Sequence, residues 1–137
     1  MIDRIAWSVF AALLLSACFQ GNIFSLEVGD CLDKPDVVGE IDKVDLRDCN
    51  ESHGYEVYAV FDVSLAAYND AAVTSQAESG CLSHFAPYVG RSYETSELWV
   101  EYLTPTEGSW SNGDREVVCM LYEPDSVLTG SQRDSRR

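Results

Sequence analysis

Four segments of the chain show a regular spacing of apolar residues. Residues 55–63 divide by alternation between two faces, which predicts a β-strand because successive side chains of a strand point to opposite faces. Residues 97–103 and 115–122 are predicted to form two further strands, with Val117, Cys119 and Leu121 on one face of the second. Residues 70–89 instead place apolar side chains four positions apart, which predicts a helix with one apolar stripe. The stripe consists of Val73, Ala77, Cys81 and Phe85. The predicted fold class is therefore α+β: a small antiparallel β-sheet with one main helix packed on one face.

The ends and faces of these elements follow from the same pattern. Asn69 or Asp70 can cap the start of the helix, and Gly90 can end it. We expect the first strand to be half-buried, with its side chains divided between two faces by strict alternation. One face would hold Tyr55, Val57, Ala59, Phe61 and Val63, and the other Glu56, Tyr58, Val60 and Asp62. Residues 104–114 are expected to form a loop with a turn at Asn112.

The N-terminal segment has the features of an export signal. Residues 5–17 form an uncharged run of about 20 Å as a helix, too short for a bilayer core of about 30 Å, and typical of a signal peptide. The small residues before Cys18 resemble the lipobox of bacterial lipoproteins, in which the cysteine receives a diacylglyceryl group and the preceding residues are removed. A plain secretory signal that happens to contain a cysteine is the alternative. We expect a signal peptide at 1–17 and two acyl chains, a stable anchor, at Cys18.

The composition indicates one small, strongly acidic domain. The chain has 137 residues, with 23 acidic and 9 basic side chains and a net charge of −14. This charge excludes bulk nucleic-acid binding and charge-driven docking to anionic lipid, because both need a basic surface. We expect a tether at 18–28, the domain itself at 29–130 and a flexible basic tail at 131–137.

Four cysteines remain besides Cys18: Cys31, Cys49, Cys81 and Cys119. An even number of cysteines in a small exported chain indicates two disulfides. Of the three possible pairings we favour Cys31–Cys49, which closes a turn-rich acidic segment, and Cys81–Cys119, which joins the helix to the last strand. A four-cysteine zinc site is the alternative. No CxxC spacing occurs in the sequence, so we expect no metal.

Several short motifs follow one another in an informative order. They are Gly29-Asp30-Cys31-Leu32-Asp33, Val44 to Cys49 followed by His53 and Glu56-Val57, Cys81 with Phe85 and Tyr88, then Pro105, Trp110, Gly113-Asp114-Arg115, Val118-Cys119 and Leu128-Thr129-Gly130-Ser131. In this order they resemble the septum formation family of bacterial envelope proteins over nearly all of 29–131. Ser52 departs from the proline usual in that family, which affects only a local turn. The resemblance implies an exported, membrane-associated domain with a role around the division septum, and it brings no catalytic residues.

The sequence contains no motif typical of an enzyme site. A GxSxG elbow, a phosphate-binding loop and an HExxH motif are all absent. His53 follows Cys49 closely, but an oxidised cysteine cannot act as a thiolate nucleophile. We expect His53 to hydrogen-bond locally and to fix the turn before the first strand. The predicted protein is therefore not an enzyme and needs no cofactor.

Aromatic and basic side chains are better candidates for binding. Trp99 lies opposite its strand neighbours, so either Trp99 or those neighbours face solvent. Trp110 either contacts a partner or closes one end of the sheet, and we favour the second role. Arg115 is expected to pair with Asp114 first and to contact a ligand second. The candidate binding residues are Trp99, Trp110, His53 and Arg115.

The sequence thus predicts a lipid-anchored protein on the extracytoplasmic face of the cell membrane. It would act as a non-enzymatic interaction module in envelope or septum formation, with the membrane and an envelope or septal protein as partners and no nucleic acid. The alternative is a small domain that binds or hydrolyses wall material. That alternative requires a concave pocket with His53 or a pair of carboxylates of raised pKa.

Overall fold

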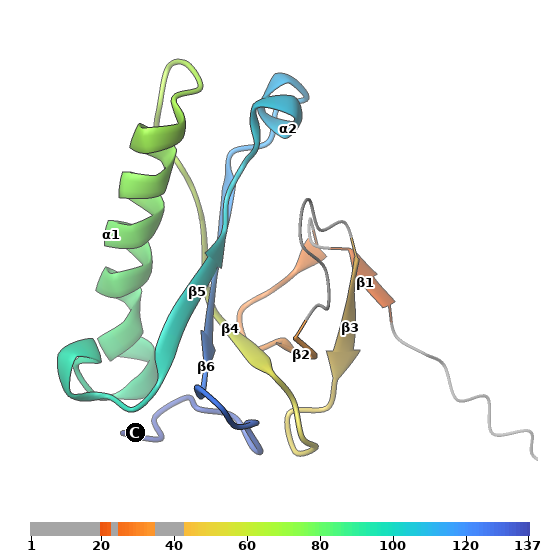
Figure 1. Ribbon diagram of the computed structural model, residues 1–137, viewed down its shortest axis with the longest axis vertical. Coiled ribbons are helices and arrows are strands. Elements are labelled where there is room, and N and C mark those ends of the chain that lie inside the picture. Colours follow the sequence, from red (N-terminus) through yellow and green to blue (C-terminus); the bar gives the residue numbers. More distant parts are fainter. Residues whose placement is uncertain (1–19, 23–24, 35–42) are drawn as a thin grey trace, which may run out of the picture.

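The strands form one six-stranded antiparallel sheet in the order β1-β3-β2-β4-β6-β5 (Figure 1). The computed structural model describes residues 20–22, 25–34 and 43–137, so the predicted signal peptide and Cys18 lie outside the described residues. The strands are β1 (Gln20–Asn22), β2 (Cys31–Leu32), β3 (Lys43–Arg47), β4 (Tyr55–Asp62), β5 (Trp99–Leu103) and β6 (Glu116–Tyr122). With one main helix on this sheet and two disulfides, the predicted fold class is confirmed.

The long helix α1 (Asp70–Val89) covers one face of β4, β6 and β5 (Figure 1). It begins as predicted, because the Asn69 side chain accepts a hydrogen bond from the Ala72 N–H at 2.9 Å. It ends at Gly90, where φ is 80° and the N–H donates to the Ala86 carbonyl. A left-handed φ is easiest for glycine, so the residue type sets where this helix stops.

The central strands are buried on both faces. In Figure 1, β2 and β3 lie on the side of β4 and β6 opposite α1. One core, under α1, includes Tyr58, Ala59, Phe85, Leu98, Val117 and Leu121. The second core, on the other face, consists of Leu26, Leu32, Val44, Val57, Val118 and Met120. Burial on both faces explains why β6 is apolar at nearly every position rather than alternating.

The predicted division of the first strand into two faces is wrong in part. The register of β4 against β6 shifts between Val57 and Ala59, and such a bulge inverts the alternation beyond it. Tyr55 and Val57 therefore pack on the second core, whereas Ala59 and Phe61 pack under α1. The strand is also buried more fully than predicted. Glu56, which alternation places on the face opposite Val57, is 0% exposed.

Part of the segment predicted as a tether, 18–28, belongs to the domain. Gln20–Asn22 pairs with β3, and Leu26 is buried in the second core. The Gly29 N–H donates to the Val57 carbonyl at 2.8 Å. An apolar side chain beside an open core is more stable buried than in water, so the domain begins before residue 29.

The segment predicted as a flexible basic tail, 131–137, is attached to the domain. The Asp134 N–H donates to a carbonyl in the last turn of α1. Arg137 forms ion pairs with Glu97 and Glu123, at 2.7 and 2.9 Å. The prediction of a flexible tail rested on the polarity of the segment alone. It left out the carboxylates of the acidic domain, which can pair with basic side chains of this segment.

The predicted loop before β6 contains a short helix, α2 (Glu107–Ser111). Its start is capped reciprocally, since Thr106 accepts from the Ser109 N–H and the Ser109 hydroxyl accepts from the Thr106 N–H. A 3₁₀ turn, η2 (Tyr93–Thr95), connects α1 to β5. In Figure 1, α2 and η2 lie at opposite ends of the sheet.

Both predicted disulfides are confirmed. Cys81 on α1 is bonded to Cys119 on β6, and both residues are 0% exposed. Cys31 on β2 is bonded to Cys49, in the turn after β3. The apolar stripe of the helix and the inward face of β6 bring the first pair together, as the spacing predicts.

Candidate functional site

A fully buried carboxylate, Glu56 of β4, joins the C-terminal segment to the sheet and to α1. It accepts hydrogen bonds from the Tyr88 hydroxyl at 2.7 Å, the Ser131 hydroxyl at 2.6 Å and the Gln132 N–H at 2.7 Å. Three donors suit an ionised carboxylate, which can only accept. A buried polar group with all these partners is a structural joint rather than a reactive group.

Two tyrosines beside this joint act as fixed donors. Burial raises the pKa of Tyr88 to about 12, with the hydrogen bond to Glu56 as the second cause. The Arg133 guanidinium lies 4.5 Å from the centroid of the Tyr88 ring. Tyr58 donates to the Cys81 carbonyl at 2.7 Å, and burial strongly raises its pKa too. Both phenols therefore stay protonated near neutral pH and cannot act as bases there.

His53 lies next to this joint, 1% exposed. Its backbone N–H donates to the Leu128 carbonyl, and its carbonyl accepts from the Leu128 N–H. Its side-chain Nδ1 lies 2.8 Å from the Glu51 carbonyl. A carbonyl can only accept, so Nδ1 carries a proton. The local hydrogen bond expected of His53 is present. Its Nε2 is buried and has no hydrogen-bond partner among the described residues.

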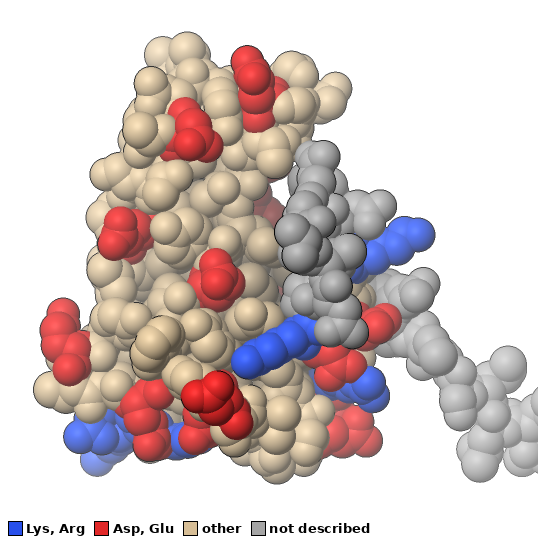
Figure 2. Space-filling view, viewed as in Figure 1, with Lys and Arg blue, Asp and Glu red and all other residues tan. Residues whose placement is uncertain are grey.

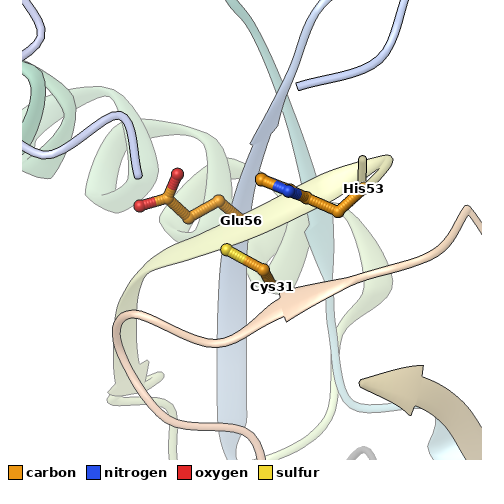
Figure 3. A group of neighbouring side chains, drawn as sticks. All are labelled: Cys31, His53 and Glu56. Atoms are coloured by element: carbon orange, nitrogen blue, oxygen red, sulfur yellow. The ribbon is translucent and has the colours of Figure 1, made fainter. Parts of the chain in front are cut away.

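Cys31, His53 and Glu56 converge from β2, from the turn before β4 and from β4 (Figure 3). Their sulfur, nitrogen and carboxylate atoms all lie within 4.8 Å of one another, and these residue types can hold zinc. The Cys31 sulfur is bonded to Cys49, however, and is not a thiolate. The Glu56 oxygens already accept three hydrogen bonds. The oxidised cluster is therefore poorly suited to a metal ion.

Trp110 and Arg115 are in direct contact. The Arg115 guanidinium carbon lies 3.4 Å from the Trp110 ring centroid, a cation–π stack. The expected ion pair of Arg115 with the Asp114 carboxylate is not what the structure shows: Nη1 donates to the Asp114 carbonyl at 2.6 Å and to the Trp110 carbonyl at 3.0 Å. Trp110 packs on the core under α1, in agreement with a role in closing one end of the sheet.

An open hollow of about 530 Å³ lies beside Arg115. Asp62, Asp114 and Glu116 contribute to its wall, and Asp62 and Glu116 are direct cross-strand partners on β4 and β6. Burial, followed by the charges of Asp114 and Asp62, raises the pKa of Glu116. The alternative prediction of a wall-acting domain requires His53 or a pair of carboxylates of raised pKa in a concave site. The hollow offers Glu116 as one acid of raised pKa, and His53 is not among the residues that line it.

Three aromatic rings form a row across neighbouring strands, which we call the aromatic row: Tyr55 of β4, Tyr122 of β6 and Trp99 of β5. The Tyr122 ring meets Tyr55 edge-on at 5.4 Å between centroids and Trp99 edge-on at 6.3 Å. Trp99 is 55% exposed, so it is Trp99 and not its strand neighbours that faces solvent. Lys34 places its ammonium 5.0 Å from the Tyr122 centroid and 5.8 Å from that of Tyr55.

One acidic side chain, Glu101, lies close to the aromatic row. Burial comes first and the charge of exposed Glu101 second among the causes that raise the pKa of Tyr55 and of Tyr122. Over the rest of the visible face, Figure 2 shows scattered acidic side chains and only a few basic ones. The row thus combines apolar area with one nearby carboxylate and one ammonium group, that of Lys34.

The four predicted binding residues lie in three separate places. Trp110 and Arg115 are together near α2, Trp99 is at the other end of β5, and His53 is buried beside Glu56. Sequence reasoning missed Glu56, whose one signal is a carboxylate inside an apolar strand, and Lys34. Nothing in the sequence around Lys34 indicates that it lies over two rings.

A profile of the septum formation family matches residues 28–136. The match contains both disulfides and α1, and it extends through the C-terminal segment that Glu56 holds. This chain belongs to the septum formation family. The resemblance based on the order of short motifs is therefore confirmed.

Two relatives share most of this septum formation domain. Each is named "Putative lipoprotein LppN", one from Mycobacterium tuberculosis and one from Mycobacterium bovis, and each is 38% identical over 114 residues. The alignment covers 80% of this chain and 63% of each relative, so the chain spans less than two thirds of their length. No solved structure matches the chain. Within the described part of the chain, no helix has the length and apolar character needed to cross a membrane.

Proposed function

We propose that this septum formation protein is a lipoprotein anchored through Cys18 on the outer face of the cell membrane. The uncharged run at 5–17 and the small residues before Cys18 support the anchor, as does the lipoprotein name of both relatives. Two disulfides support a place outside the cytosol, because disulfides persist in oxidising compartments. Two acyl chains on one cysteine give a stable attachment.

On the membrane, the domain works as a non-enzymatic interaction module in envelope growth or septum formation. The observation that carries this proposal is the aromatic row, in which Trp99 is 55% exposed and backed by two further rings. Aromatic side chains that stay rigid and exposed are typical of binding hot spots. The nearby charge of Glu101 and the seat of Lys34 on the rings favour a protein partner that presents basic and apolar side chains.

Chemical cross-linking of intact envelopes tests this proposal. Wild-type protein should be recovered with a discrete partner, and Trp99→Ala should reduce that recovery about tenfold or more, as for other aromatic hot spots. Leu82→Ala is the matched control, because Leu82 is an exposed apolar residue, 39% accessible, on α1. Equal recovery with Trp99→Ala, or no partner together with normal septa in a deletion strain, would overturn the proposal.

A second candidate function is the binding or hydrolysis of a wall ligand in the hollow beside Arg115. The hollow favours it, because Glu116, whose pKa is raised, lies there with Asp62, Asp114 and a guanidinium, and pairs of carboxyl groups can carry out glycoside cleavage. Purified protein would then convert wall polymer, and Glu116→Gln would abolish this turnover while Glu78→Gln, at an exposed acid of α1, would not. Absence of turnover with wild-type protein excludes hydrolysis.

A further inference from the structure

The two disulfides differ in their access to solvent. Cys81 and Cys119 are both 0% exposed in the core under α1. In the other disulfide, Cys31 is 1% exposed but Cys49 is partly exposed, in the turn after β3. Cys49 is therefore the residue of this pair that a dissolved thiol reaches more readily.

The buried sulfur of this pair lies near the imidazole of His53, whose Nε2 has no hydrogen-bond partner among the described residues. Figure 3 shows the Cys31 sulfur pointing from β2 toward the side chains of His53 and Glu56. Its sulfur lies within 4.8 Å of a ring nitrogen of His53, and Nε2 is buried without a hydrogen bond. A buried polar atom left unpaired requires an explanation, since most such atoms find a partner. A thiol at Cys31 would supply one.

We propose that Cys31–Cys49 is a site of thiol–disulfide exchange with an external protein dithiol, a role beyond the proposed interaction function. A thiolate of the dithiol attacks the Cys49 sulfur, a new sulfur–sulfur bond forms there, and the Cys31–Cys49 bond breaks. The electron pair goes to Cys31, which takes up the proton released by the attacking thiol, and the resulting Cys31 thiol donates its S–H to Nε2 of His53. The second thiolate of the dithiol then displaces Cys49 and leaves as the oxidised disulfide.

The groups around His53 leave its Nε2 as an acceptor. Glu56 on β4 supplies a carboxylate atom within 4.8 Å of the cluster. Tyr88 on α1 donates to that carboxylate, and Arg133 lies 4.5 Å from the centroid of the Tyr88 ring. Because the Glu51 carbonyl accepts the Nδ1 proton, Nε2 is free to accept the S–H of a Cys31 thiol.

Trapping with a monothiol tests which sulfur is attacked. Native full-length protein is treated with 2-mercaptoethanol in the presence of an alkylating agent, and its cysteine peptides are mapped by mass. The expected product carries the adduct on Cys49 and the alkyl group on Cys31, and it forms about tenfold or more faster than opening of Cys81–Cys119. An adduct on Cys31, or both disulfides opening together at the rate of global unfolding, overturns the proposal.

Substitution of His53 tests its role. A Cys31 thiol that donates to Nε2 is stabilised as the leaving group, so removal of the imidazole should slow opening of the Cys31–Cys49 bond. His53→Gln should slow trapping severalfold, whereas His84→Gln, at the exposed histidine of α1, should match wild type. Equal trapping rates in wild type and His53→Gln contradict the role. If the His53 variant does not fold, the mapping of the adduct still decides the proposal.

Discussion

The regions around the two disulfides are held together in different ways. Under α1, a large apolar core encloses the Cys81–Cys119 disulfide completely. The Cys31–Cys49 disulfide belongs to neither apolar core: it reaches the surface at Cys49 and adjoins Glu56, whose polar contacts attach the C-terminal segment. The difference shows how a short chain places a covalent link where apolar burial is small. It also separates a structural disulfide from one that can react.

Loss of the disulfide under α1 should have the largest effect on stability. Its sequence separation of 38 corresponds to about 4 kcal/mol of unfolding free energy, against about 3 kcal/mol for the separation of 18 in the other pair. The double variant Cys81→Ala/Cys119→Ala also removes buried sulfur from a packed core and leaves a void. Denaturant unfolding of this variant and of Cys31→Ala/Cys49→Ala measures both losses. A larger loss for the second variant would reverse the comparison.

The polar contacts of Glu56 should rank next. Glu56→Gln places an amide N–H₂ against hydrogen-bond donors of Tyr88, Ser131 or Gln132, and two donors cannot bond each other. We expect the free energy of unfolding to fall by about 2 kcal/mol. Hydrogen exchange at 130–137 should become faster, because this carboxylate holds that segment. Tyr88→Phe, which removes one donor only, is the graded control at about 1 kcal/mol. Unchanged exchange in the Glu56 variant would show that the segment is held by its ion pairs instead.

Removal of a repulsive pair near the hollow should give a small gain. The pKa of Glu116 is raised in the fold, so its charge opposes folding at neutral pH. This cost disappears as pH falls through the raised pKa, and it is absent below the ordinary value of 4.5. Glu116→Gln, opposite Asp62, should therefore stabilise by about 0.5 kcal/mol at neutral pH and by nothing in acid. Unfolding curves at both pH values check the sign, and a loss at neutral pH contradicts it.

The smallest effect on stability is expected at the aromatic row. Trp99 is more than half exposed, so Trp99→Ala should change the unfolding free energy by about 0.5 kcal/mol or less while it weakens partner recovery. Trp110→Ala, by contrast, removes a ring that packs on the core and on Arg115, and it should destabilise the protein clearly. Thermal unfolding of the two variants separates a binding tryptophan from a packing one. Equal losses would remove that distinction.

Local signals predicted much of the fold. The helix ends are set by Asn69 and Gly90, and the disulfide partners follow from cysteines on the inward faces of a helix and a strand. The faces of β4 could not be predicted, because the bulge after Val57 depends on pairing with β6. Burial of Glu56 was missed for a related reason: its partners come from 32 to 76 positions away, and only the closed fold brings them together.

The candidate site was predicted less well. Exposure of Trp99 was one of two outcomes that alternation allows, and the register of β5 on β6 decides between them. Arg115 was expected to pair with the carboxylate of its neighbour, but stacking on Trp110 turns it toward backbone carbonyls. Lys34 lies over the rings of Tyr55 and Tyr122, which are distant from it in the sequence. No short motif encodes such a contact.

The most direct test is the intact mass of the protein extracted from membranes, measured with and without reduction. We expect a chain that begins at Cys18, carries a diacylglyceryl group and has four cysteines that alkylate only after reduction. A mass that retains residues 1–17, or native protein whose Cys81 or Cys119 alkylates without reduction, would contradict an exported, anchored and disulfide-bonded domain.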